Sequence, residues 1–210
     1  MEVALIRHAM PIRKELASGV ADPELSADGH AQAKLLAEYL SVERFDELYV
    51  SPMKRAQETA APVARALNLP MITIDGVAEY DRNSSEYVPV EELKATNDPR
   101  WQQMVNGDWS GFDESEEEFA HGVVSTIESL ITQHESQKIA IVCHGGVINA
   151  YVSHCLKLPN SRGFFYPNYT SIHRIAAART GERSIVTLNE TSHLRLSGLP
   201  MGLFQKSVIQ

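Results

Sequence analysis

The sequence predicts an α/β fold, a three-layer α/β/α sandwich in which a mostly parallel central sheet is flanked by helices. The first observation is a set of three short apolar runs at residues 3–6, 48–50 and 139–143. Continuous apolar runs bounded by breakers are typical of buried strands in a parallel sheet. The second observation is that helical patterns follow these runs, since strands that alternate with helices form parallel sheets. The expected helices cover residues 31–40, 52–67 and 147–157.

The remaining elements are expected between and after these units. Ser26 is a suitable N-cap for the first helix, whose neighbour His30 is expected at the surface. Ser51 is a suitable N-cap for the second helix, with Pro52 at its first position and Arg55 in its first turn. The other expected elements are a strand at 71–74, short helices at 86–93 and 99–104, a longer helix after the acidic run at 113–118, and a hairpin of strands at 171–178 and 183–189.

Length and composition favour a soluble globular protein with one domain. The chain has 210 residues, 43% of them hydrophobic and 22% charged, which suits a single domain with a sizeable core. We expect one domain over residues 1–210, with a cap-like insertion at about 80–121. The net charge of −8 disfavours binding to nucleic acid or to an anionic membrane.

The expected location is the cytoplasm. The apolar runs are too short to cross a bilayer, and the chain enters its first strand without a signal-peptide pattern. Cys143 is expected on a buried strand and Cys155 on the helix after it. Free thiols are therefore favoured over a disulfide.

Cationic and imidazole side chains follow three of the predicted strands. Arg7 and His8 end the first strand, Arg55 follows the second, and His144 ends a later one. Ligands bind at the carboxyl ends of strands in open α/β sheets. A guanidinium suits phosphate, and a neutral imidazole can act as a nucleophile or as an acid or base. Taken alone, the first stretch fits an ordinary strand end with two surface polar residues equally well.

The segments that carry these residues read LIRHAMP, SPMKRAQETA and VCHGGVI. In order and spacing they resemble the histidine phosphatase superfamily, also called the phosphoglycerate mutase-like family, from Val3 to about His193. The resemblance implies that His8 attacks phosphorus and forms a phosphohistidine. Its other ring nitrogen then needs an acceptor, which we expect to be a backbone carbonyl. Arg7, Arg55 and His144 would neutralise the phosphoryl oxygens.

The resemblance also assigns a proton donor. Glu79 matches the position of the glutamate that protonates the leaving group in this family. The segment after it, Asp81-Arg82-Asn83-Ser84-Ser85, departs from the family's glycines and aromatic-Glu-Gly pattern, so Asp81 is the reserve candidate. In place of the Gly and Glu that follow Arg-His in the mutases, this chain has Ala9 and Met10. Both departures favour hydrolysis over mutase activity.

Further substrate contacts are expected from three regions. The loop at 12–23 corresponds to one that grips phosphate in the family, so Arg13 or Lys14 could do so here, although a solvated charge pair fits equally well. Asn168 falls in a segment that lies near the site in relatives. The residues that could contact the non-phosphate part of the substrate are Arg82, Tyr87 and Trp101, although a lone aromatic is more often part of a core.

No metal or other cofactor is expected. The eight histidines lack a ligand spacing such as His-x-x-x-His, and arginines would supply the positive charge. The acidic run at 113–118 is interpreted as the start of a helix and a solvated face.

The sequence thus predicts a metal-independent phosphomonoesterase acting on a small phosphate monoester, with inorganic phosphate as the other expected ligand. The alternatives are phosphoglycerate mutase-type phosphoryl transfer and a catalytically silent member that only binds a phosphorylated ligand. The apolar tail at 199–204 could cover an interface, which leaves a homodimer open.

Overall fold

The computed structural model describes residues 1–108, 110–112, 114–158 and 165–203, and its main feature is a six-stranded sheet with the strand order β4-β3-β6-β1-β7-β8. The first four of these strands run parallel to one another, and β7 is antiparallel to both β1 and β8. This confirms the predicted α/β class with a mostly parallel sheet. The strands are β1 (Glu2–Arg7), β3 (Glu47–Val50), β4 (Met71–Thr73), β6 (Lys138–Cys143), β7 (Ile172–Ala177) and β8 (Arg183–Glu190).

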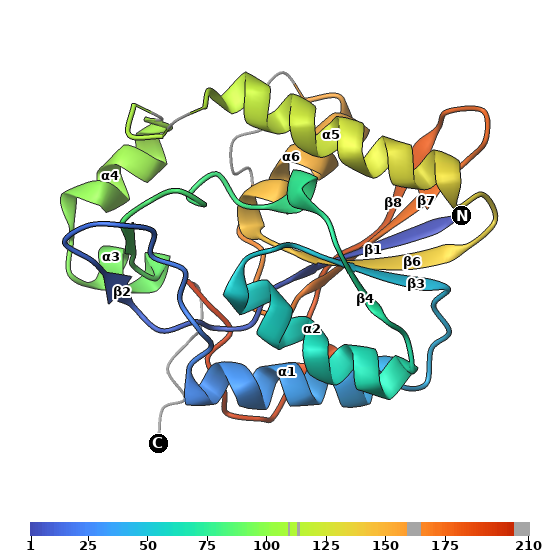
Figure 1. Cartoon of the computed structure of the whole chain (residues 1–210), viewed down its shortest axis with the longest axis horizontal. Helices are drawn as coiled ribbons and strands as arrows, with labels where there is room; N and C mark the ends of the chain where they lie inside the picture. Colours follow the sequence, from blue (N-terminus) through green and yellow to red (C-terminus); the bar gives the residue numbers. More distant parts are fainter. Residues whose placement is uncertain (109, 113, 159–164, 204–210) are drawn as a thin grey trace.

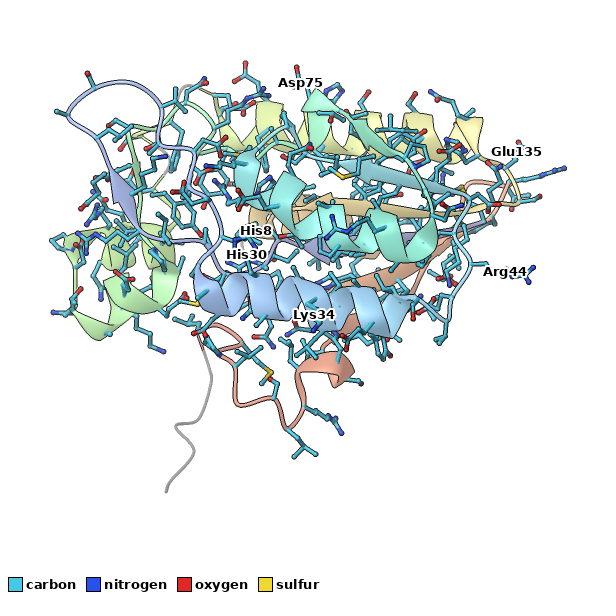
Figure 2. All side chains as sticks on the ribbon, turned by 60° about the horizontal axis from the view of Figure 1, so that its bottom comes forward. His8, His30, Lys34, Arg44, Asp75 and Glu135 are labelled. Atoms are coloured by element: carbon cyan, nitrogen blue, oxygen red, sulfur yellow. The ribbon has the colours of Figure 1, made fainter. Side chains whose placement is uncertain are left out.

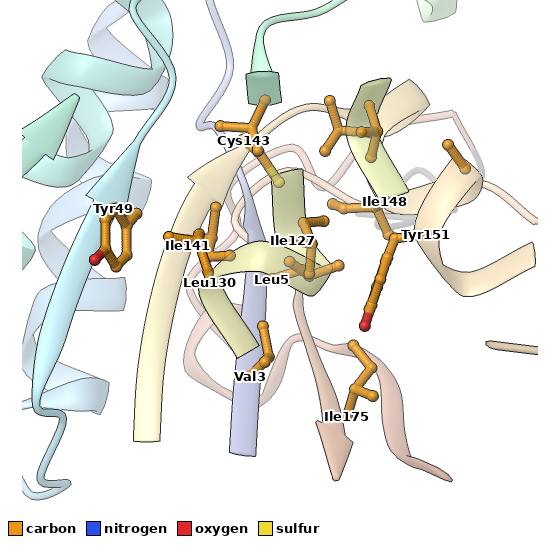
Figure 3. Packing of buried hydrophobic residues seen from close by; sticks show 14 of the residues in the cluster. Val3, Leu5, Tyr49, Ile127, Leu130, Ile141, Cys143, Ile148, Tyr151 and Ile175 are labelled. Atoms are coloured by element: carbon orange, nitrogen blue, oxygen red, sulfur yellow. The ribbon is translucent and has the colours of Figure 1, made fainter. Parts of the chain in front are cut away.

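Helices cover both faces of the sheet, as the sandwich requires (Figure 1). Because side chains alternate along a strand, Val3 and Leu5 of β1 face one layer while Ala4 and Ile6 face the other. Figure 3 shows the first layer, where β1 and β6 pack against Ile127 and against the helix that follows β6. One face carries α1 (Ala27–Leu40) and α2 (Lys54–Leu67), and the other carries α5 (Glu116–Gln133) and α6 (Gly145–Leu156).

Helix starts follow the sequence at α1 and depart from it at α2. Ser26 caps α1 as predicted, accepting a hydrogen bond from the backbone of Gly29 at 3.0 Å. The prediction that Ser51 caps α2 is wrong, because the helix begins at Lys54 and its N-cap is Met53. Ser51 and Pro52 form a turn before the helix, which frees the Ser51 hydroxyl for another partner described below. Arg55 does lie in the first turn, as predicted.

A separate group of short elements lies at the end of the molecule towards which β1, β3 and β6 run (Figure 1). The strand β2 (Lys14–Glu15) pairs with β5 (Glu86–Tyr87), and α3 (Val90–Ala95) and α4 (Pro99–Asn106) follow. The short helix predicted at 86–93 is therefore a strand in its first two residues, because they pair with the loop that follows β1. Arg100 joins this group, contacting Asp98 at 2.7 Å, Glu86 at 2.9 Å and Glu15 at 3.4 Å.

The predicted hairpin is confirmed, and two 3-10 helices were not predicted. Strands β7 and β8 form the expected hairpin, and the short 3-10 helices η1 (Asp75–Val77) and η2 (Ser192–Leu194) complete the chain's regular structure. Cys143 is buried on β6, Cys155 lies on α6, and both are free thiols. None of the helices within the described ranges is both long and apolar enough to span a membrane. Phe164 and Phe204, which belong to segments considered above, lie outside the described residues.

Candidate active site

The carboxyl ends of β1, β3 and β6 meet beside a cavity of about 570 Å³. Figure 2 shows His8 inside the molecule, whereas His30 and Lys34 project from its surface; His30 is therefore exposed, as predicted. Six of the predicted site residues line the cavity together with the reserve acid Asp81, whereas His144 is not among its lining residues. The six are Arg7, His8, Arg55, Glu79, Tyr87 and Trp101.

His8 is held in one tautomer by its own backbone neighbour. The side chain is 2% exposed, and Nδ1 donates a hydrogen bond to the carbonyl oxygen of Ala9 at 2.8 Å. Because a carbonyl can only accept, the proton sits on Nδ1 and the lone pair is on Nε2. Burial, followed by the charges of Arg55 and Arg7, lowers the pKa of His8 well below its ordinary value. The imidazole is therefore neutral at pH 7, as a nucleophile must be, and the expected backbone carbonyl partner is found.

Arg7 is a buried cation fixed by aromatic rings. Its Nη1 donates to the carbonyl oxygen of Pro167 at 2.6 Å. The guanidinium lies 4.3 Å from the ring centre of Tyr169 and 4.9 Å from that of Tyr166, distances typical of cation–π contacts. Its Nε is buried and makes no hydrogen bond to any described residue. A buried N–H without an acceptor is costly unless a ligand supplies one.

Arg55 is the second buried cation, with 1% of its surface exposed. Its Nη2 donates to Asp81 Oδ1 at 2.8 Å, and its guanidinium lies 4.7 Å from the ring centre of Tyr87. Within the described part of the chain, Nε and Nη1 have no hydrogen-bond partner. Arg7 and Arg55 thus present unsatisfied donors in the cavity where His8 lies, which is the arrangement that binds a phosphate group.

His144 follows β6 and is the N-cap residue of α6. Its Nε2 lies 2.7 Å from the hydroxyl oxygen of Ser51, which also accepts from the backbone N–H of Met53 at 3.3 Å. The Ser51 hydroxyl can accept from Met53 and still donate its own proton to Nε2, an arrangement in which the His144 proton lies on Nδ1. The His144 ring centre is 5.1 Å from that of His8. Burial and the charge of Arg55 hold the pKa of His144 well below its ordinary value.

Glu79 is a buried carboxyl group whose pKa is about 7. Its Oε2 accepts from the backbone N–H of Gly146 at 2.8 Å, and its Oε1 accepts from that of Tyr80 at 3.3 Å. Burial, and then the charge of Asp81, raise the pKa of Glu79 to about 7, although both hydrogen bonds oppose the shift. A carboxyl with this pKa can both give and take a proton at neutral pH.

The second glycine of His-Gly-Gly now has a physical reason. A Cβ atom at Gly146 would overlap Glu79 Oε1 and lie 2.9 Å from the Tyr80 ring. A Cβ at Gly145 would meet nothing closer than Arg7 Nε at 3.8 Å, an ordinary contact. Gly146 therefore allows the carboxyl group to lie directly against the start of α6.

Besides His144, three predicted substrate contacts lie outside the cavity lining. Arg13 is exposed and donates to Glu15 at 2.7 Å, the solvated charge pair that was the alternative. Arg82 approaches Asp75 at 3.5 Å, and the backbone N–H of Asn168 donates to Asn189 Oδ1 at 2.8 Å. Their contact with substrate stays a prediction that this geometry does not support.

Other residues of the site were not singled out from the sequence. Ser51 contacts His144 Nε2 at 2.7 Å, and Tyr166 and Tyr169 pack on Arg7. Asn149, whose Oδ1 is buried without a described partner, lines the cavity beside Gly146. The aromatic run at 165–169 was the available signal, because buried arginines in proteins commonly stack on aromatic rings. Across the described ranges, no group of three or more His, Cys, Asp or Glu side chains could hold a metal ion.

Comparison with known proteins agrees with this geometry. The chain is 30% identical over 201 residues to phosphoserine phosphatase 1 of Hydrogenobacter thermophilus, covering 92% of this chain and 94% of that protein. The crystal structure of phosphoserine phosphatase from Entamoeba histolytica in complex with 3-phosphoglyceric acid matches with a TM-score of 0.71 and 25% identity, covering 92% of this chain and 98% of that one.

A third similarity concerns the fold alone. Mycobacterial glucosyl-3-phosphoglycerate phosphatase in complex with VO3 has a TM-score of 0.74 and 19% identity, covering 90% of this chain and 99% of that one. The sequence model of the histidine phosphatase superfamily (branch 1) matches residues 3–191, nearly the whole chain. The chain therefore belongs to the histidine phosphatase superfamily and is a phosphatase that hydrolyses phosphate monoesters.

Proposed function

We propose that His8 and Glu79 divide the chemistry of this phosphatase between them. The observation that carries the proposal is their pairing in one cavity: His8 is neutral with its lone pair on Nε2, and Glu79 is a carboxyl with a pKa near 7. Asp81 is a weaker candidate for the acid, because its carboxylate is already paired with Arg55.

In the first step, His8 Nε2 attacks phosphorus, and the bond between phosphorus and the ester oxygen breaks. Glu79 gives its proton to the departing alkoxide, which leaves as an alcohol. In the second step, Glu79 takes a proton from water, and the resulting hydroxide attacks the phosphohistidine. The phosphorus–nitrogen bond breaks, and inorganic phosphate and neutral His8 are restored.

The positive charge for both steps comes from the chain itself. Arg7 and Arg55 would bind the phosphoryl oxygens through nitrogens that no described residue uses. His144 would donate from Nδ1, which is likewise buried without a described partner. Charge develops on these oxygens in the transition state, and donors fixed in advance stabilise it without reorganisation.

The proposal also includes a cap over the site and a cellular location. The elements β5, α3 and α4 would act as the cap over the site, since Tyr87, Val90 and Trp101 from them line the cavity. A cytoplasmic location is supported by the two free thiols.

The test is to trap the intermediate. Rapid quenching with a ³²P-labelled aryl phosphate under alkaline conditions should yield acid-labile label on His8, and His8→Ala should give neither label nor turnover. His30→Ala is the matched control, because His30 lies on α1 with 61% of its side chain exposed. Undiminished turnover in His8→Ala would exclude the mechanism. Release of phosphate from 3-phosphoglycerate, without isomerised product, would separate hydrolysis from mutase activity.

A further inference from the structure

The cavity has a second half that the phosphoryl chemistry does not use. Its volume of about 570 Å³ is typical of sites for whole small molecules and far exceeds a phosphoryl group. The lining away from Arg7 and Arg55 is dominated by apolar and aromatic side chains. They are Tyr80, Val90, Trp101, Met104, Val105, Phe112, Phe119, Phe165 and Leu203, and we call them the apolar lining.

Helix α4 contributes to this lining in an unusual way. Trp101, Met104 and Val105 are spaced so that they share one helical face, yet α4 has no buried residue. Met104 is 43% exposed and Val105 is 59% exposed. The apolar face of this amphipathic helix therefore borders the cavity instead of packing into the core. A contiguous exposed apolar face of this kind marks a binding surface.

Another part of the apolar lining consists of aromatic rings that pack on one another. The Tyr80 ring packs edge-on against Phe112 at 4.7 Å and against Phe119 at 5.8 Å between ring centres. Phe119 is 5% exposed and belongs to the core between the sheet and helices α5 and α6, so these rings are anchored there. Aromatic pairs prefer such edge-to-face arrangements, so these rings hold one another in place.

Charge in the cavity argues against a second anionic group on the substrate. Among the described lining residues, the permanent cations are Arg7 and Arg55, and both serve the phosphoryl group. The other ionisable side chains there include the carboxyl groups of Glu79, Asp81 and Asp108. A substrate carboxylate or second phosphate would therefore meet acids and apolar surface along the lining. Lys94, whose ammonium lies 5.6 Å from the Trp101 ring centre, is not itself a lining residue.

From these observations we infer that the substrate is a phosphate monoester of an apolar alcohol, preferably one with an aromatic ring, that carries no second anionic group. The inference rests on the proposed function, since it requires the phosphoryl group to lie at Arg7, Arg55 and His8. Phosphoserine, which bears a carboxylate, is therefore not the substrate that we expect for this chain, although relatives of the chain are phosphoserine phosphatases.

The test compares four alkyl monophosphates by kcat/KM: 2-phenylethyl phosphate, ethyl phosphate, O-phosphoserine and 3-phosphoglycerate. All four are esters of primary alcohols, so they differ mainly in what the apolar lining meets. We expect 2-phenylethyl phosphate to exceed each of the others by roughly tenfold or more, from burial of its ring. Equal values, or a preference for either carboxylate-bearing ester, would overturn the inference.

Variants test whether the apolar lining itself binds the non-phosphate part of the substrate. Trp101→Ala should lower the ratio of kcat/KM for 2-phenylethyl phosphate to that for ethyl phosphate. Val105→Arg should raise 3-phosphoglycerate relative to 2-phenylethyl phosphate, because it places a cation at the apolar lining. Val42→Arg is the matched control, since Val42 is 87% exposed and lies in the turn after α1. An unchanged ratio in both Trp101→Ala and Val105→Arg would exclude the apolar lining as the substrate's site.

These outcomes separate the two proposals. If none of the esters is hydrolysed and no label appears on His8, the proposed function fails. If label appears on His8 and the carboxylate-bearing esters are preferred, the proposed function stands and only the substrate class is wrong.

Discussion

Arg55 and Asp81 form a buried ion pair, with Nη2 donating to Oδ1 at 2.8 Å. The Arg55 side chain is 1% exposed and that of Asp81 is 18% exposed. Asp81 also stands two residues after Glu79, and its charge is the second cause of the raised pKa of Glu79, after burial. One carboxylate thus acts on both Arg55 and the proposed acid.

The first prediction is that Asp81→Asn shifts the pH profile. Removing the negative charge lowers the pKa of Glu79, so the donor loses its proton at lower pH. A proton donor works only below its pKa, and kcat/KM for an alkyl phosphate therefore declines at lower pH in the variant than in the parent. The profile should be measured between pH 5 and 9, about two units either side of neutrality, where such a carboxyl titrates. If Asp81→Asn instead abolishes the dependence of rate on the leaving group, Asp81 is the acid.

The second prediction concerns Glu79→Gln. The amide can still accept the hydrogen bond from Gly146, but it cannot give a proton to the leaving group. Alkyl phosphates, whose alkoxides are poor leaving groups, should lose about 10²–10⁴-fold in kcat/KM. An aryl phosphate with an acidic phenol should lose much less in the phosphorylation step. Burst kinetics with the aryl ester separate this step from slower hydrolysis of the phosphohistidine, and equal losses for both ester types would argue against Glu79 as donor.

The third prediction assigns a positioning role to Ser51. In Ser51→Ala the Nε2 atom of His144 loses its hydrogen-bond partner, so the proton is no longer fixed on Nδ1. Binding of inorganic phosphate, measured as its inhibition constant, should weaken about tenfold, less than the 10²–10³ that deleting a whole donor typically costs in rate. Ser153→Ala is the matched control, because Ser153 is 2% exposed and its hydroxyl has no hydrogen-bond partner among the described residues. Equal inhibition constants in the two variants would remove Ser51 from the site.

The fourth prediction compares two glycines. A methyl group at Gly146 must displace the Glu79 carboxyl, so Gly146→Ala should reproduce the leaving-group dependence of Glu79→Gln and lower the melting temperature. Gly122 lies on the exposed face of α5, and a Cβ there meets no atom within 4 Å. Gly122→Ala should keep full activity and gain about 0.5–1 kcal/mol in stability. Normal turnover of an alkyl phosphate by Gly146→Ala would show that the carboxyl does not need its place against α6.

Much of the site followed from the sequence because of a geometric property of parallel sheets. Residues at the carboxyl ends of neighbouring parallel strands lie at one edge, so Arg7, His8 and His144 had to converge once β1 and β6 were identified as parallel. Arg55 followed for the same reason, in the first turn of the helix after β3. Once an apolar strand is placed inside a parallel sheet, the residues at its carboxyl end must lie at that edge of the sheet.

The prediction failed where a side chain or segment could form its contacts with several different partners. Ser51 fits an N-cap by sequence, but its hydroxyl bonds to His144, which lies 93 positions further along the chain. Arg13 was a candidate phosphate ligand, but Glu15 on the adjoining strand β2 engages it. Residues 86–87 pair with β2, a contact between distant segments that no local periodicity reveals. The apolar lining was also hidden, because a stripe of apolar residues on a helix looks the same whether it faces a core or a cavity.

Burial of the Glu79 carboxyl also sets the pH dependence of folding. In the unfolded chain this group ionises near its ordinary pKa of 4.5, whereas in the native state the value is about 7. The native state therefore holds this proton more tightly, and the contribution of Glu79 to the free energy of unfolding falls as pH rises from 4.5 to 7. The lowered pKa values of buried His8 and His144 act in the opposite direction. The loss of this contribution at alkaline pH is roughly 3–4 kcal/mol, since the pKa differs by about 2.5 between the two states and one pKa unit corresponds to about 1.4 kcal/mol. Glu79, the proposed proton donor at neutral pH, thus lowers the stability of the native state at that pH. Selection for stability alone would favour a different residue at this position.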